Sequence, residues 1–290
     1  MISEETLKKI RKIEIISRKA ARDIFAGQYH SAFKGRGMEF SEVREYQFGD
    51  DVRFIDWNVS SRLGRLFIKQ FVEERELTII LAIDLSASQQ FVSGNKSKKD
   101  IAVELSALIA FTAMLNNDKV GLLIFTDRIE IFVPPKKGRT HLLRLIRDII
   151  EFKPRGRGTA IGSAMAYLTS LLKKKAVVFL ISDFLDDNFA TALKIASRKH
   201  DLITITIADR RELEAPRRGI FQLKDLESGE EFNADFSRSS VRFDYQNINS
   251  TRSAGLADLF RKYSIDSVTI NPESDYEKPL FDLFLKRKHK

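Results

Sequence analysis

The stretch that decides the fold is LTIILAIDLSAS, residues 77–88. It begins with a continuous apolar run rich in β-branched side chains, which is typical of a strand buried on both faces of a parallel sheet. Asp84, Ser86 and Ser88 follow at alternate positions. One carboxylate and two hydroxyls can therefore turn toward one point where the strand runs out into a loop. The stretch predicts a central strand with a polar site at its carboxyl end.

The same arrangement recurs farther along the chain. Residues 176–182, AVVFLIS, form a second apolar run, and Asp183 closes it. Between the two strands, Gly158-Thr159 opens a predicted helix and offers a third hydroxyl. In an open α/β sheet, ligands bind beyond the carboxyl ends of the strands, where the strand order reverses. If the two strands are neighbours at that point, both loops reach one crevice.

The residue types predict a divalent-cation site. Carboxylate and hydroxyl oxygens are hard ligands that suit Mg²⁺ or Mn²⁺ in octahedral geometry and do not suit zinc or copper. The predicted ligands are Asp84, Ser86, Ser88 and Thr159, with Asp183 binding directly or through water. The alternative is a vestigial loop whose serines only cap the next helix. We favour the metal site because three separate loops each supply a hard ligand.

From residue 77 onward, strands and helices alternate, which predicts an α/β fold with a doubly wound, mostly parallel sheet. Strands are expected at 77–84, 120–126, 129–133, 176–183, 202–208 and 266–270, and helices at 98–116, 139–152, 159–173, 188–199, 239–263 and from 275. The apolar runs at 120–125 and 129–133 are separated by the three residues 126–128, a spacing that permits a hairpin. The 129–133 strand is therefore expected to be an antiparallel edge strand. A second hairpin is expected from 220–226 and 231–234.

The N-terminal part of the chain has a different character. Apolar residues recur at helical spacing over 5–26, which predicts an N-terminal helix. Short strands at 38–40, 52–56 and 66–71 predict a small β-rich subdomain. The expected domains are 1–76 (helix and β-rich subdomain), 77–210 (the core of the α/β domain) and 211–290 (hairpin, helical extension, final strand and helix).

Two sets of motifs resemble known families. Asp84, Ser86 and Ser88, then Thr159, then Asp183 resemble the metal-ion-dependent adhesion site of von Willebrand factor A domains. Upstream, GRGMEF (35–40), REY (44–46) and GDDVRFIDW (49–57) resemble a narrower bacterial and archaeal family, domain of unknown function 58, which carries a von Willebrand A-like domain. The resemblance covers about residues 25–240. It implies a von Willebrand A-like, Rossmann-type fold and a metal site, and it implies no settled activity.

Composition limits the class of protein. The chain has no cysteine, which excludes disulfides, thiolate metal sites and cysteine catalysis. It has no apolar run of about 18 residues or more, so no transmembrane helix is expected, although peripheral membrane association stays open. The N-terminus is too charged for a signal peptide. These features favour a cytoplasmic protein.

Positive charge is concentrated in one stretch. Residues 136–157 contain eight basic side chains against two acidic ones, within a chain of net charge +9. Because this stretch leads into Thr159, we expect several of its cations to rim the metal site and to contact an acidic partner. The expected partner contacts are Lys136, Lys137, Arg139, Arg155 and Arg157. A solvated helix face is the plainer alternative.

Catalysis is not expected. An aspartyl-phosphate enzyme needs a second acid two residues after the nucleophile, and Ser86 stands there. The four histidines are scattered, and no P-loop occurs. We therefore expect a non-catalytic, cation-dependent protein-binding module. The resemblance implies a MoxR-type AAA+ ATPase as partner, in a chaperone-like or metal-insertion assembly. A protein that binds nucleic acid or an anionic surface through 136–157 is the alternative, and a metal-dependent phosphohydrolase is less favoured.

Overall fold

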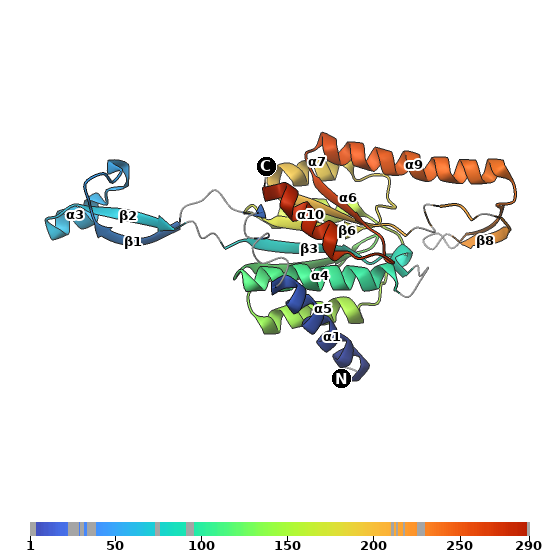
Figure 1. Ribbon diagram of the computed structural model, residues 1–290, viewed down its shortest axis with the longest axis horizontal. Coiled ribbons are helices and arrows are strands. Elements are labelled where there is room, and N and C mark those ends of the chain that lie inside the picture. The colour runs from blue at the N-terminus through green and yellow to red at the C-terminus, as the bar shows by residue number, and fades with distance from the viewer. Residues whose placement is uncertain are drawn as a thin grey trace. The chain divides into compact units, whose positions relative to one another are not determined.

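The computed structural model describes residues 4–22, 29, 32–33, 39–72, 76–90, 96–209, 212, 214–216, 218–224 and 230–288. The chain divides into two compact units (Figure 1). The smaller unit spans residues 33–77, and the larger unit contains the rest of the chain. Each unit is described by itself below.

The larger unit is built on a six-stranded sheet with the strand order β10-β7-β6-β3-β4-β5. The strands are β3 (Thr78–Asp84), β4 (Lys119–Phe125), β5 (Ile129–Lys136), β6 (Val177–Ser182), β7 (Asp201–Ile207) and β10 (Asp266–Ile270). All neighbouring pairs are parallel except β4 and β5, which confirms the antiparallel edge. The chain runs outward from β3 to β5 and returns to β6 on the other side of β3. The strand order therefore reverses between β3 and β6.

Helices cover both faces of this sheet, as a doubly wound fold requires (Figure 1). On one side lie α1 (Glu4–Ala20), α4 (Lys98–Leu115) and α5 (Arg139–Glu151); on the other lie α6 (Ile161–Leu171), α7 (Ala190–Lys199) and α9 (Ser239–Lys262). Alternate strand residues such as Ile80 and Ala82 pack against the second set of helices. The hairpin of β8 (Ile220–Lys224) and β9 (Glu231–Asp235) and the last helix α10 (Glu277–Lys288) complete the unit. The predicted fold class is confirmed.

Helix α1 packs against helices α4 and α5 of the larger unit. It contacts α4 through the ion pair Lys9–Asp100 (2.6 Å) and α5 through Arg139–Glu14 (2.7 Å). The expected boundaries grouped this helix with the β-rich segment, whereas these contacts assign it to the larger unit. The last part of the predicted helix, residues 23–26, lies outside the described residues. Within the described chain, no helix combines the length and apolarity needed to cross a membrane.

The described residues of the smaller unit form two strands and not three. β1 (Glu39–Glu45) pairs antiparallel with β2 (Phe67–Val72), and η2 (Val52–Phe54) and α3 (Trp57–Leu63) lie between them in sequence. The strand expected at 52–56 is therefore wrong. Asp51 accepts a hydrogen bond from the backbone of Arg53, and Asp56 accepts from Asn58 and Val59, so each aspartate starts a helical turn. Aspartates that cap the backbone in this way compete with strand pairing.

Candidate functional site

The strand register places the two aspartate loops side by side. β3 and β6 are adjacent and parallel, and Ile83 pairs with Ile181, so Asp84 and Asp183 leave the sheet at the same edge. This edge is formed by the carboxyl ends of the strands at the point where the strand order reverses. The prediction that the two strands are neighbours is confirmed.

Asp84 is fully buried and both of its carboxylate oxygens accept hydrogen bonds. Ser182 Oγ donates to Asp84 Oδ2 (2.6 Å), and the Ser86 backbone N–H donates to Asp84 Oδ1 (2.9 Å). Ser182 Oγ also accepts from the Phe184 backbone N–H (2.9 Å). Sequence reasoning missed Ser182, although a serine that ends an otherwise apolar strand was a visible signal.

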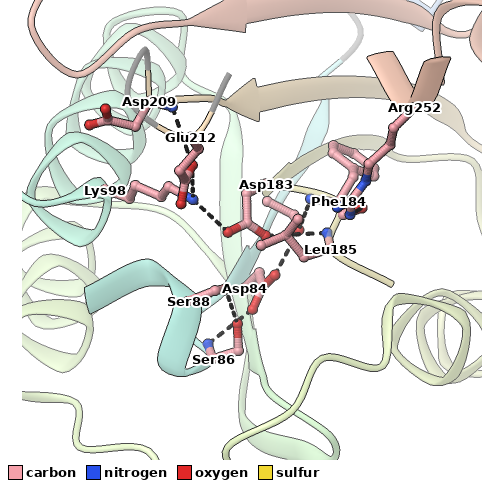
Figure 2. A network of polar contacts seen from close by, with 11 residues as sticks. Asp84, Ser86, Ser88, Lys98, Asp183, Phe184, Leu185, Asp209, Glu212 and Arg252 are labelled. Atoms are coloured by element: carbon pink, nitrogen blue, oxygen red, sulfur yellow. Dashed lines mark hydrogen bonds and ion pairs between the residues drawn. The ribbon is translucent and has the colours of Figure 1, made fainter. Parts of the chain in front are cut away.

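Ser86 and Ser88 lie together beside Asp84. Both are buried, and their hydroxyl oxygens are 3.0 Å apart (Figure 2). Neighbouring oxygen ligands of an octahedral Mg²⁺ ion, each about 2.1 Å from the metal, are themselves roughly 3 Å apart. The spacing of the two hydroxyls therefore matches one edge of such an octahedron.

Asp183 is held by a lysine that the sequence analysis did not identify. Figure 2 shows Lys98 between Asp183 and Glu212. Lys98 Nζ lies 2.8 Å from Asp183 Oδ2 and 2.6 Å from Glu212 Oε2, and the side chain of Lys98 is 0% exposed. The other oxygen of Asp183, Oδ1, accepts from the Leu185 backbone N–H (3.3 Å). Lys98 is the first residue of α4 and lies between Lys96 and Lys99 in a lysine-rich stretch, so no local pattern distinguishes it.

Negative charge predominates around Asp84 among the residues that the structure describes. Lys98 is paired with Asp183 and Glu212, and the buried carboxylate of Asp84 lies close enough to Asp183 for the two charges to interact. Burial, and then the charge of Asp183, raise the pKa of Asp84 to about 7, against the opposing hydrogen bonds from Ser182 and Ser86. Burial also raises the pKa of Glu212. Burial alone would lower the pKa of Lys98, but the two carboxylates it contacts outweigh burial and raise it. Such a site favours an additional cation.

Thr159 lies in a loop that is tied to the same edge of the sheet. The Arg157 carbonyl accepts from Ala87 N–H (3.1 Å), and Ala160 N–H donates to the Thr126 carbonyl (2.9 Å). Thr159 itself lines a groove between α6 and α7. The structure thus brings together Asp84, Ser86, Ser88 and Asp183, with the loop of Thr159 beside them.

The side-chain oxygens of Asp84, Ser86 and Ser88 are suitable ligands for a hard divalent cation. Asp183 fits an indirect role through water, because Lys98 already occupies one of its oxygens. Among the described residues, no cluster contains three or more His, Cys, Asp or Glu side chains arranged to hold a metal. Cation binding here would consequently depend on the serine hydroxyls as well as on Asp84.

The five predicted partner contacts are divided between opposite ends of the sheet. Lys136 pairs with Val120 at the start of β4, whereas Asp84 pairs with Phe125 at its end. At about 3.3 Å per residue, this separation is roughly 16 Å. Lys136, Lys137 and Arg139 therefore do not rim the Asp84 site, because the antiparallel β5 carries the chain away from it.

Arg155 and Arg157 do return to the site. The backbone N–H of Arg155 donates to Glu130 Oε1 (3.0 Å) at the start of β5, and the carbonyl of Arg157 accepts from Ala87 next to Ser86. Both arginine side chains are exposed. Of the five predicted partner contacts, only Arg155 and Arg157 therefore lie beside the site.

Comparisons with known proteins show which family the chain belongs to. The family described as "Protein of unknown function DUF58" matches residues 42–255. An uncharacterised protein of Mycobacterium tuberculosis is 29% identical over 272 residues, which cover 92% of this chain and 85% of that protein. The uncharacterised protein YeaD of Bacillus subtilis is 27% identical over 122 residues, 42% of this chain and 27% of its own length.

Two solved structures are similar in fold at low sequence identity. The conserved hypothetical protein BatB from Bacteroides thetaiotaomicron has a TM-score of 0.48 at 15% identity, covering 74% of this chain and 100% of its own. The SpRpn10 VWA domain has a TM-score of 0.38 at 11% identity, covering 73% and 95%. The family match at residues 42–255 spans most of the sequence, and the chain therefore belongs to the DUF58 family.

Proposed function

We propose that the protein is a non-catalytic binding module in which Mg²⁺ or Mn²⁺ at Asp84 recruits an acidic residue of a partner protein. One observation carries this proposal: buried Asp84 lies beside the charge of Asp183, while Lys98 is already paired with Asp183 and Glu212. A divalent cation would relieve the excess negative charge without any rearrangement of the sheet.

The residues of the chain have distinct parts in this proposal. Asp84, Ser86 and Ser88 would hold the cation, with Asp183 acting through water and Thr159 supplied by the neighbouring loop. When bound, the cation supplies a positive charge with one open coordination position. A carboxylate of the partner would fill that position, so affinity would depend on the cation and on the surrounding contact surface together.

A binding role is favoured over catalysis by the arrangement around Asp84. Its two oxygens accept from Ser182 and Ser86, and Ser86 occupies the place where a phosphate-transferring enzyme would need an acid. Lys98, the buried cation, is engaged with Asp183 and Glu212.

The proposed partner is a MoxR-type AAA+ ATPase, which the family resemblance implies, and such a partner would meet this protein in the cytoplasm. Exposed Arg155 and Arg157 support an acidic partner surface at this edge, because cations beside the site steer an approaching carboxylate. The protein would then act as an adaptor in a chaperone-like or metal-insertion assembly.

The alternative, binding of nucleic acid or an anionic surface through 136–157, has weaker support. Arg139 is paired with Glu14, and Arg144 and Arg147 are paired with Asp148. These cations are therefore partly neutralised within the protein, and the stretch extends between opposite ends of the sheet.

Calorimetry on the metal-stripped protein tests the site, and affinity capture tests the partner. We expect Mg²⁺ or Mn²⁺ to bind in the millimolar range or tighter, and Asp84→Ala to abolish this binding. Capture of the purified MoxR-type ATPase from the same organism should require the cation and fail in EDTA. Binding that survives EDTA but falls steeply with salt would favour the anionic-surface alternative. Absence of divalent binding in the native protein would end the proposal.

A further inference from the structure

A groove of about 770 Å³ lies between α6 and α7. Both helices start at the carboxyl edge of the sheet, because each precedes a parallel strand that begins at the opposite edge. Thr159, Asp186 and Asn188 line one end of the groove, and Ser170 and Ile195 line it farther along the helices. The groove therefore starts at Thr159, in the loop beside the candidate cation site, and leads away from that loop.

The walls of the groove allow another chain segment to approach closely. Along α6 the lining residues are Gly162, Ser163, Ala166 and Thr169, all with small side chains. Across from them, Ile195 of α7 is 52% exposed and supplies an apolar wall. Small side chains on a helix let a second helix pack at short distance. Covering the half-exposed side chain of Ile195 would remove apolar surface from water and so stabilise the complex.

Basic residues flank the two helices that form these walls, whereas Asp186, at the Thr159 end, is the one charged residue among those that line the groove. Residues 158–182 and 188–200, which include both helices, contain no aspartate or glutamate. They contain Lys173, Lys174, Lys175, Lys194, Arg198 and Lys199. Arg198 follows Ile195 by three residues and so continues the stripe of α7 that lines the groove. Lys199 Nζ bonds to the Thr169 carbonyl (2.5 Å), which brings α7 against the far part of α6.

We propose that this groove receives an acidic helix of the partner protein, about three turns long. The inference rests on the proposed function, because the helix would place one carboxylate on the cation at the Thr159 end. Its other end would set acidic side chains beside Lys173 and Arg198. The length follows from the eleven residues of α6, which span roughly 16 Å.

A synthetic peptide tests the groove directly. The probe is a fluorescein-labelled 14-residue helical peptide with glutamates at both ends and one face of alanine and leucine. Its control carries glutamine in place of the glutamates. Fluorescence anisotropy in Mg²⁺ should show the glutamate peptide binding to the native protein and the glutamine peptide binding at least tenfold more weakly, a loss that corresponds to about 1.4 kcal/mol.

Two tryptophan variants separate the groove from the rest of the surface. Ala166→Trp fills the groove, whereas Ala254→Trp places the same side chain on the exposed face of α9. Both positions are exposed, so both variants should keep the native melting temperature and Mg²⁺ affinity. Ala166→Trp should weaken peptide binding by about tenfold or more, and Ala254→Trp should leave it unchanged.

A charge reversal tests the far end of the groove. The double substitution Lys173→Glu with Arg198→Glu should weaken binding of the glutamate peptide. It should restore binding of a peptide that carries lysine at its far end.

The outcomes separate this inference from the function on which it rests. The groove inference is overturned, and the cation site stands, if Mg²⁺ binds but the peptide binds Ala166→Trp as tightly as it binds the native protein. The same conclusion follows if Mg²⁺ binds but the peptide binds neither protein. If Mg²⁺ does not bind the native protein, the proposed function fails by itself. Sedimentation of the native protein as a dimer, and of Ala166→Trp as a monomer, would assign the groove to a second copy of the chain and overturn the inference.

Discussion

Lys98 and Asp183, 85 residues apart in the sequence, form a hydrogen-bonded ion pair of 2.8 Å inside the protein. Neither side chain is more than 3% exposed. The pair joins the first turn of α4 to the loop after β6, and Glu212 extends it to the segment after β7. The carboxylate next to Asp84 is therefore already partnered before any external cation arrives.

Replacing Lys98 with methionine should destabilise the protein strongly. Asp183 would remain buried, and Glu212 partly buried, without their ammonium. Removal of one partner of a buried pair costs about 3–5 kcal/mol. Urea denaturation measures this loss. Millimolar Mg²⁺ should recover part of it if the cation neutralises the same carboxylates. Lys96→Met is the matched control. Lys96 is 44% exposed in its pair with Glu104, so this substitution should change the free energy of unfolding little. A Lys98→Met protein of native stability would contradict the assigned contacts.

The metal-free protein should lose stability as the pH rises from about 4 to about 7. Burial and the charge of Asp183 raise the pKa of Asp84 from 3.8 to about 7, so in this window the folded protein binds a proton that the unfolded chain has released. The free energy of unfolding should therefore fall by up to about 1.4 kcal/mol per pH unit from this group, and level off above pH 7.

The same proton should compete with the divalent cation. Below pH 7, Mg²⁺ affinity should fall by up to about tenfold per pH unit, because the ligand must lose its proton to bind. Calorimetry at several pH values measures this slope, and Asp84→Asn should remove the stability slope described above. Asp127→Asn is the control, since Arg128 lowers the pKa of Asp127 and the exposed group does not titrate in this window. A Mg²⁺ affinity independent of pH from 5 to 7 would count against a buried Asp84 ligand.

Ser182→Ala should weaken both the fold and the cation site. The hydroxyl donates to Asp84 and accepts from Phe184 N–H, so its removal leaves a buried donor and a buried acceptor short of a partner, at a cost of about 1–3 kcal/mol. The hydrogen bond from Ser182 also lowers the pKa of Asp84. Its loss should raise that pKa and shift the pH dependence of Mg²⁺ affinity upward. Ser163→Ala, on the exposed side of α6, serves as control and should change neither measurement.

Charge removal should affect partner association at one end of the sheet only. Arg155→Ser with Arg157→Ser should slow association with the MoxR-type ATPase and weaken its salt dependence, without changing Mg²⁺ affinity. Lys136→Ser with Lys137→Ser removes the same charge roughly 16 Å away along the strands. That distance exceeds the Debye length of about 8 Å at physiological ionic strength, so this pair of substitutions should have little effect. Stopped-flow association rates compare the two, and equal slowing would reject the assignment of Arg155 and Arg157.

Local pattern was sufficient for the strands that carry the site. The apolar runs before Asp84 and Asp183 are long enough to predict buried strands, and the alternation of strands and helices predicts their parallel arrangement. The same kind of reasoning failed at 52–56, where apolar residues suggested a strand. There, capping by Asp51 and Asp56 outweighs the strand preference of the apolar residues between them.

The sequence by itself determined where Asp84, Ser86 and Ser88 would gather, because a strand end and a short turn bring near neighbours in the chain together. Only the tertiary structure decided which cation holds Asp183 and which arginines lie beside the site. In sequence Lys98 resembles the nearby Lys96 and Lys99, and only the packing of α4 on the sheet buries it. Lys136 likewise resembles Arg155, and only the register of β5 places it at the opposite end of the strands. Contacts across many residues depend on strand order and register, and these are set by the packing of the whole sheet.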